Sequence, residues 1–431
     1  MRRIAERLSW AALAAVLALQ PVAALAQQAP RLPDLGSSGE VLPPEEERQF
    51  PREFERYVRA QGVLVDDPLV VDWLREMGYR LAHLSEGRDR EFHFHVLRVP
   101  GINAFAAPAG VVAMNAGLIL AAETEDEVAG VVAHEISHVT QNHLKRGMEE
   151  AQRVSLPVML ATMGLVLAGG MSGAMDARTA SGILATGSGL SQQAQINYTR
   201  QNEAEADRIG IQLMYRAGYD PRGMADFFET LRRWARSQGD GPPEYLRTHP
   251  LTVSRVAEAR QRVDQLPAVP DRGDDRFEFI RARLRVIMAQ HADEAVQQFL
   301  ARLESRTGDE AANRYGLALA LVRARLPERA APHVRWLLER DPDSQMFRLL
   351  EADRLLAEDR IDDALEVLEQ LHRDFGSSDA VSRELVRALL RTERAENARR
   401  AADLARELVR RTPHDPELTR LLARSADLAG D

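Results

Sequence analysis

The feature that most limits the fold of this chain is an internal repeat in its last third. Equivalent places at Asp341, Asp374 and Thr412 recur at intervals of roughly 33 and 38 residues, each after a helical pattern. Such a period predicts stacked helix pairs, because one pair alone cannot bury its apolar face. Small residues stand where paired helices would approach closely: Gly316, Ala318 and Ala364.

A period near 34 residues is typical of tetratricopeptide repeats. The full consensus stands in none of the units, and the second interval carries a short insertion. Turn-forming residues gather before the repeats, at Pro267, Pro270 and Gly273, and mark a boundary. We therefore expect a first domain over residues 51–268 and an all-α tetratricopeptide-repeat solenoid over residues 274–431.

Residues 1–26 have the pattern of a cleavable secretory signal. Arginines precede an apolar run over residues 8–19, and the small residues Ala24 and Ala26 fit cleavage before Gln27. A membrane anchor is the alternative, but a spanning helix needs about 20 apolar residues. The chain has no cysteine, which excludes a lipoprotein anchor. We expect the mature protein in the bacterial periplasm.

Two further segments stand out by composition. Residues 27–50 are rich in Pro, Gly, Ser and Glu, which predicts a flexible linker. Residues 154–175 carry no charge and contain Pro157 and a glycine cluster. They could be read as a membrane segment, but the glycines and the proline favour a buried or membrane-contacting hairpin, and the segment is a candidate mobile lid.

The first domain combines helices with a small sheet. Apolar residues at helical spacing predict two helices over residues 51–86. Alternating residues over 91–99 predict a strand, and the turn at 108–110 joins two more short strands. His93 and His95 share one face of the first strand, and we assign that face to solvent.

The stretch VVAHEISHVT, residues 131–140, carries candidate metal ligands. Thr124 and Glu127 form a capping box that predicts the start of its helix. His134 and His138 are offset by about 40° on that helix, so both imidazoles lie on one face and can bind one zinc. Glu135 points away from the ligands, as a general base beside the metal would.

A third ligand is needed, and the stretch NEAEADRIG supplies candidates. Glu203 and Asp207 share a helix face, while Glu205 points elsewhere. We assign Glu203 as the third ligand of one Zn²⁺ per chain and Asp207 as the carboxylate that orients a ligating imidazole. The alternatives are a chance HExxH match and an acidic helix face in solvent.

HEISH followed by EAEAD resembles the HtpX-like family of gluzincin metallopeptidases over nearly all of the mature chain. The resemblance implies an α+β zinc metallopeptidase domain, mostly helical with a small sheet, and a zinc metalloendopeptidase activity. It also implies that His249 occupies the open zinc position at rest and that Arg255 contacts the developing oxyanion. The alternatives are a structural histidine and a surface arginine. An edge strand beside the site is the implied substrate rail: Asn103, Ala104, Phe105 and Ala106.

The resemblance also implies degradation of misfolded or stalled outer-membrane proteins, with help in their assembly. The partners that it implies are unfolded substrates, the outer-membrane β-barrel assembly machinery through the repeats, and a peripheral membrane contact. A net charge of -9 without a basic tract argues against nucleic acid. The alternative is a noncatalytic periplasmic assembly chaperone or scaffold with a structural zinc site.

Overall fold

The computed structural model describes most of the chain. The described residues are 44–87, 89–144, 146, 189–238, 243–270, 272–273, 276–412 and 415–430. The expected signal sequence and the uncharged segment over 154–175 lie outside them. Among the helices of the described part, none is both long enough and apolar enough to cross a membrane.

The first two helices are α2 (Pro44–Ala60) and α3 (Pro68–Leu84), which confirms the helix pair expected there. However, α2 begins inside the segment expected to be a linker, so that expectation is wrong for residues 44–50. Three glutamates in the first turn favour a helix start through the helix dipole. Phe50 then anchors the helix, because its side chain is fully buried and stacks on Phe54.

The predicted small sheet is confirmed. It contains β1 (His93–Leu97), β2 (Ala104–Ala107) and β3 (Val111–Asn115) in the order β1-β3-β2. β1 is parallel to β3, and β2 is antiparallel to it across the short 3-10 turn Pro108–Gly110. Within this described sheet β2 is an edge strand.

The strand face that carries His93 and His95 is not solvated as expected. The His95 side chain is buried, and its ring lies 5.4 Å from that of Phe54 on α2. Burial lowers the pKa of His95 to about 4, so the ring is neutral at physiological pH. The prediction was wrong because α2, which lies far earlier in the sequence, covers this face of the sheet.

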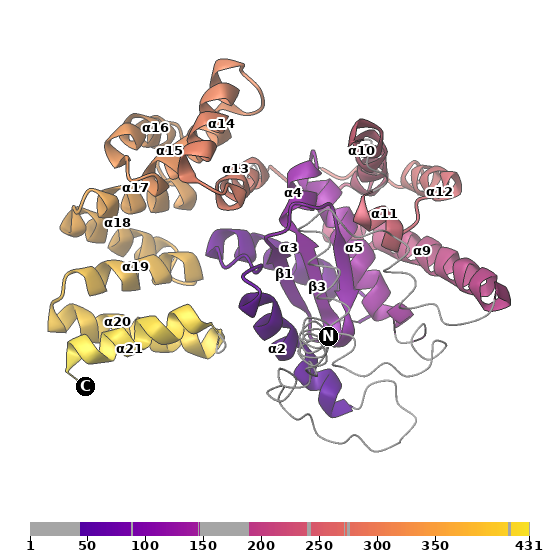
Figure 1. Cartoon of the computed structure of the whole chain (residues 1–431), viewed down its shortest axis with the longest axis horizontal. Coiled ribbons are helices and arrows are strands. Elements are labelled where there is room, and N and C mark those ends of the chain that lie inside the picture. The colour runs from indigo at the N-terminus through magenta and orange to yellow at the C-terminus, as the bar shows by residue number, and fades with distance from the viewer. Residues whose placement is uncertain are drawn as a thin grey trace, which may run out of the picture. The chain divides into compact units, whose positions relative to one another are not determined.

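The remaining helices of the first domain surround the candidate site. α5 packs against α3, α9, α10 and the edge strand β2 (Figure 1). Its position in the middle of these elements buries most of its length. The helices are α4 (Ala116–Ala121), α5 (Glu125–Thr140), α9 (Gly189–Ala217), α10 (Arg222–Gln238), α11 (Glu244–Thr248) and α12 (Val253–Val263).

The C-terminal region is helical throughout its described residues, as expected. Successive helices pack on one another, and α15, α17, α19 and α21 also pack each on the odd-numbered helix before it. The helices are α13 (Arg276–Met288), α14 (Ala292–Glu304), α15 (Glu310–Arg323), α16 (Pro327–Arg340), α17 (Gln345–Ala357), α18 (Ile361–Asp374), α19 (Asp379–Arg391), α20 (Ala395–Arg411) and α21 (Pro416–Ala429).

A backbone feature marks the period of these helix pairs. Arg325, Asp359 and Glu393 have left-handed φ angles and follow one another at intervals of 34 residues. Each stands just after an odd-numbered helix, so the same turn recurs once per helix pair. The expected close approach of paired helices is found at Gly316 on α15, where a Cβ would lie 2.2 Å from the ring of Phe299 on α14. The identification of the units as tetratricopeptide repeats remains a prediction.

The helix α13 joins the two regions. It packs against α3 and α4 on one side and α15 on the other. The partly buried guanidinium of Arg283 donates to both carboxylate oxygens of Asp67 at 2.7 Å and to the Tyr315 hydroxyl at 2.8 Å. One apolar core includes buried residues from Val65 to Leu350. The turn-forming residues between 268 and 274 therefore mark a boundary in the sequence but do not divide this core.

Candidate metal centre

The capped start of α5 fixes the rotation of the helix that carries the motif. The Thr124 hydroxyl accepts a hydrogen bond from the Glu127 backbone N–H at 3.2 Å. The Glu127 carboxylate in turn accepts from the Glu123 N–H at 2.9 Å. The predicted capping residues therefore do begin the helix, and two turns later His134 and Glu135 are both buried.

Two glycines let the neighbouring helices approach α5 at the site. A Cβ on Gly210 of α9 would lie 3.3 Å from the His134 backbone nitrogen and 2.8 Å from the end of the Met224 side chain. A Cβ on Gly130 of α5 would lie 2.9 Å from the Met224 Cα on α10. The sequence analysis missed these positions, although a glycine inside a helical pattern is a signal of close packing.

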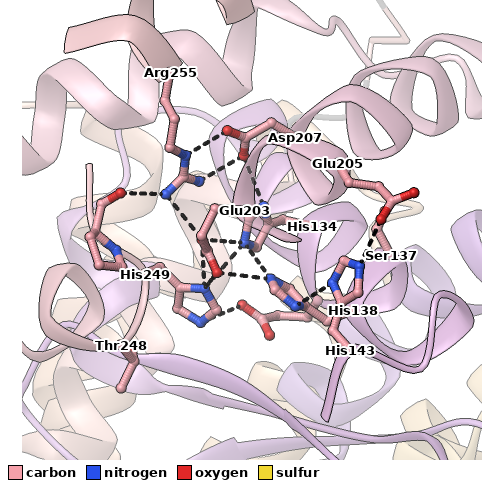
Figure 2. A network of polar contacts seen from close by, with 12 residues as sticks. His134, Ser137, His138, His143, Glu203, Glu205, Asp207, Thr248, His249 and Arg255 are labelled. Atoms are coloured by element: carbon pink, nitrogen blue, oxygen red, sulfur yellow. Dashed lines mark hydrogen bonds and ion pairs between the residues drawn. The ribbon is translucent and has the colours of Figure 1, made fainter. Parts of the chain in front are cut away.

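The expected ligands converge in the structure (Figure 2). The Nε2 atoms of His134 and His138 lie 3.0 Å apart. The Glu203 carboxylate places Oε2 3.4 Å from the first of these nitrogens and Oε1 3.4 Å from the second. Four-coordinate zinc with ligand bonds of about 2.1 Å separates its ligands by about 3.4 Å, so this donor set fits one zinc ion.

A fourth ligand atom joins this group from the loop after α11. His249 Nδ1 lies 3.2 Å from His134 Nε2. The four candidate ligand atoms, from His134, His138, Glu203 and His249, all lie within 4.8 Å of one another. The His249 ring also stacks on the buried Tyr245 ring, with centroids 4.8 Å apart. The structure thus brings His249 to the metal position, as the family resemblance implies.

Asp207 and Arg255 form the layer behind the ligands. His134 Nδ1 lies 2.9 Å from Asp207 Oδ1. Arg255 donates to Asp207 through Nε at 2.7 Å and Nη2 at 2.8 Å, while its Nη1 lies 3.0 Å from Glu203 Oε2. All three nitrogens of this buried guanidinium therefore face carboxylates. These contacts support a role in fixing the two acidic side chains, and the expected oxyanion contact remains a prediction.

The buried charges perturb one another strongly. Burial alone would lower the pKa of His134, but interactions of its protonated ring with the acceptors Asp207 and Glu203 outweigh burial and raise the pKa to about 10. Burial lowers the pKa of His138 to about 4, because its one bond to Glu203 does not compensate. Burial would raise the pKa of Glu203, but the neighbouring histidines hold it well below its usual range. Glu203 and His138 are therefore in the forms that bind metal, a carboxylate and a neutral imidazole, whereas His134 releases a proton when metal binds.

Glu135 stands beside the convergent ligands as a buried carboxylate. Its side chain is fully buried, and neither oxygen accepts a hydrogen bond from any residue that the structure describes. His249 Nε2 is close, at 3.5 Å from Oε1. A buried carboxylate without donors is costly, and such a group is retained where its chemistry is needed.

The edge strand β2 offers outward backbone groups beside the site. Asn115 N–H donates to Asn103 O at 2.9 Å, so the backbone groups of Asn103 face β3. Because backbone direction alternates along a strand, the N–H and C=O groups of Ala104 and Ala106 face away from β3. A cavity of about 680 Å³ lies at the end of this strand, and both Ala106 and His138 line it.

Comparison with known proteins agrees with this geometry. Residues 68–263 match the family model described as Peptidase family M48. The chain is 32% identical over 391 residues to the beta-barrel assembly-enhancing protease of Escherichia coli (strain K12), which covers 90% of this chain and 79% of that protein. It is 35% identical over 328 residues to the putative beta-barrel assembly-enhancing protease of Vibrio cholerae, covering 75% and 67%.

A more distant relative matches a smaller share of the chain. The mitochondrial metalloendopeptidase OMA1 of Schizosaccharomyces pombe is 29% identical over 177 residues, which is 41% of this chain and 48% of that protein. The names of these relatives describe proteases and metalloendopeptidases, and the compact His and Glu cluster fits the zinc that such enzymes use. The chain belongs to peptidase family M48 and is a zinc metalloendopeptidase.

Proposed function

We propose that this enzyme cleaves misfolded or stalled outer-membrane β-barrel proteins in the periplasm and assists their assembly. Its zinc ligands are His134, His138 and Glu203, and its general base is Glu135. The secretory pattern of residues 1–26 supports the location. Relatives that span most of the chain are named for β-barrel assembly, which supports the substrate class.

The observation that carries the proposal is a metal site beside a buried carboxylate that accepts no hydrogen bond from the described residues. Three ligands from two helices converge, and the buried Glu135 next to them accepts no hydrogen bond within the described chain. A structural zinc site needs only its ligands, whereas here a buried carboxylate stands beside them, 3.5 Å from the ring of the fourth candidate ligand, His249. This arrangement therefore favours a catalytic site over a structural one.

The residues of the metal centre have separate roles in peptide hydrolysis. Zinc, when bound, polarises the scissile carbonyl and lowers the pKa of a water to about 7. Glu135 takes a proton from the attacking water and passes it to the leaving amine. Asp207 holds His134 through Nδ1, and Arg255 holds Asp207 and Glu203, so the ligands are fixed before substrate arrives.

The edge strand supports a preference for unfolded chains. The outward N–H and C=O groups of the partly exposed Ala106 can pair with an extended peptide as a further strand, whereas Ala104 is fully buried. Main-chain pairing needs an extended segment, which folded β-barrels do not offer, and it requires no particular side chain. We infer that access to an extended segment selects the substrate.

The C-terminal helices supply the partner surface in this proposal. Their 34-residue turn period is that of repeat solenoids, which commonly present an extended binding surface. The assembly machinery or the substrate itself would bind there.

A genetic experiment separates proteolysis from noncatalytic help in assembly. The gene is deleted in a host strain, and the Glu135→Gln variant is supplied in its place. Full rescue of an outer-membrane defect by this variant would favour the noncatalytic scaffold.

The substrate class is tested with one β-barrel protein in two states. The wild-type enzyme is incubated with the barrel protein unfolded in buffer and with the same protein folded in detergent micelles. We expect rapid cleavage of the unfolded form and none of the folded form. Equal cleavage of both forms would contradict selection by extended segments, and cleavage of neither would contradict the substrate class.

A further inference from the structure

A histidine outside the HExxH motif stands directly behind one of the zinc ligands (Figure 2). His143 Nδ1 lies 3.0 Å from His138 Nδ1, on the side of that ring that faces away from the metal position. Its other nitrogen, Nε2, lies 3.1 Å from Glu205 Oε2. His143 is itself buried. These contacts form a continuous line from the ligand ring to a carboxylate.

The chain builds this line by ending α5 and turning back. The helix ends at Thr140, and Asn142 then adopts a left-handed φ of 54°. Asparagine tolerates this conformation better than most residues. Arg90 holds the turn, because its Nη1 donates to Val139 O at 2.8 Å and to Asn142 Oδ1 at 3.0 Å. The turn returns His143 to the ring of His138.

The proton positions along the line follow from the metal site. A neutral imidazole has one N–H, so when His138 binds metal through Nε2 its hydrogen is on Nδ1. The two facing Nδ1 atoms cannot both carry hydrogen, so His143 accepts at Nδ1. Its own hydrogen is then on Nε2 and is donated to Glu205. Every hydrogen bond in the line points from the metal toward the carboxylate.

The other ligand histidine has a shorter version of the same arrangement. His134 Nδ1 lies 2.9 Å from Asp207 Oδ1, with no residue between them. Asp207 and Glu205 both belong to α9, which also carries the ligand Glu203. One helix therefore provides a metal ligand and a carboxylate for each ligand imidazole, directly for His134 and through His143 for His138.

We propose that His143 and Glu205 are positioning residues that fix the tautomer and ring orientation of His138. Hydrogen bonding at the remote nitrogen makes a ligand imidazole more basic and holds it in the metal-binding geometry. The proposal rests on His138 being a zinc ligand. Replacing a histidine that is buried for packing alone would not change the zinc affinity of a correctly folded variant. Zinc affinity therefore separates a positioning role from a packing role.

The test measures zinc affinity of the purified full chain by competition with a chromophoric chelator. His143→Leu keeps an apolar filling but removes the acceptor, and we expect its zinc affinity to fall about 10-fold to 100-fold. His143→Asn offers an amide oxygen near the place of Nδ1, so we expect it to recover most of this loss. Thermal unfolding of the metal-free forms should be close to that of wild type for both variants.

A matched control is His95→Leu, which removes another buried imidazole of the same domain and should leave zinc affinity unchanged. If His143→Leu does not fold, Glu205→Ala takes its place, because that side chain is partly exposed, and a loss of about 10-fold is expected. If the folded variant, either His143→Leu or its substitute Glu205→Ala, binds zinc with wild-type affinity, the proposal is overturned. Absence of zinc from the wild-type enzyme would instead refute the metal site itself.

Discussion

His249 Nδ1 lies 3.1 Å from each carboxylate oxygen of Glu203, in the position of a fourth ligand. A resting site closed by this ring must release it before substrate can reach the metal. His249→Ala should therefore raise peptidase activity several-fold while zinc remains bound by three ligands, measured by casein cleavage and metal content. Unchanged or lower activity would contradict the expectation that His249 blocks the metal position in the resting enzyme. His333→Ala, in the C-terminal helices, is the control.

The outward backbone groups of the edge strand give a second prediction. Ala106→Pro removes one N–H from the open edge of β2 without removing a bond to β3. We expect KM for an unfolded substrate to rise about threefold to tenfold, since one hydrogen bond contributes about 1 kcal/mol, with little change in kcat. Ala106→Gly retains the N–H and should behave as wild type. Identical KM values for the two variants would remove this strand from substrate binding.

The approach of α9 to α5 is a third point of test. Gly210→Val places two methyl groups against the backbone of His134, where even a Cβ is crowded. The helices must separate, so Glu203 moves away from the imidazoles and zinc affinity should fall at least about 10-fold. Gln212→Val, at an exposed position of the same helix, controls for helix propensity. Normal zinc binding by Gly210→Val would mean that the two helices adapt without loss.

The buried carboxyl of the α5 cap predicts a pH dependence of stability. Burial raises the pKa of Glu127 to about 7 from an ordinary value of 4.5. The folded state therefore retains a proton that the unfolded chain releases, and this stabilisation is complete below pH 4.5 and lost as the pH rises through 7.

The glutamine variant isolates this single proton. The free energy of unfolding of wild type, relative to Glu127→Gln, should fall by about 2 kcal/mol between pH 5 and pH 8. Chemical denaturation of both proteins at the two pH values measures it. Glu258→Gln, on an exposed face of α12, should show no such trend. A constant difference between wild type and Glu127→Gln would exclude a proton held by this carboxyl.

The local parts of the site could be predicted from the sequence. Helical spacing fixed the common face of His134 and His138, and the capping residue Thr124 located the start of their helix. The same spacing rule selected Glu203 and Asp207 on a second helix. The structure brings these side chains to one site, because each placement depends on residues within about one turn of one another, where helix geometry alone sets the relative directions. Their roles as ligands and orienting carboxylate remain proposals.

The parts that depend on distant contacts could not be predicted. His95 was assigned to solvent because nothing in its strand indicates that α2 covers it. His143 lies past the end of its helix, and its direction depends on the left-handed turn at Asn142. Its contact with Glu205 joins residues 62 positions apart. A helical pattern specifies a face, but it does not specify what packs against that face.

The separate roles of the zinc ligands and the general base are tested most directly by measuring bound zinc and casein cleavage together, in wild type and Glu135→Gln. Glutamine keeps the size of the buried side chain but cannot take the proton. We predict one zinc per chain in both proteins, with cleavage lowered by at least about 100-fold in the variant. Cleavage by Glu135→Gln at the wild-type rate, or active wild-type enzyme without zinc, would contradict the mechanism.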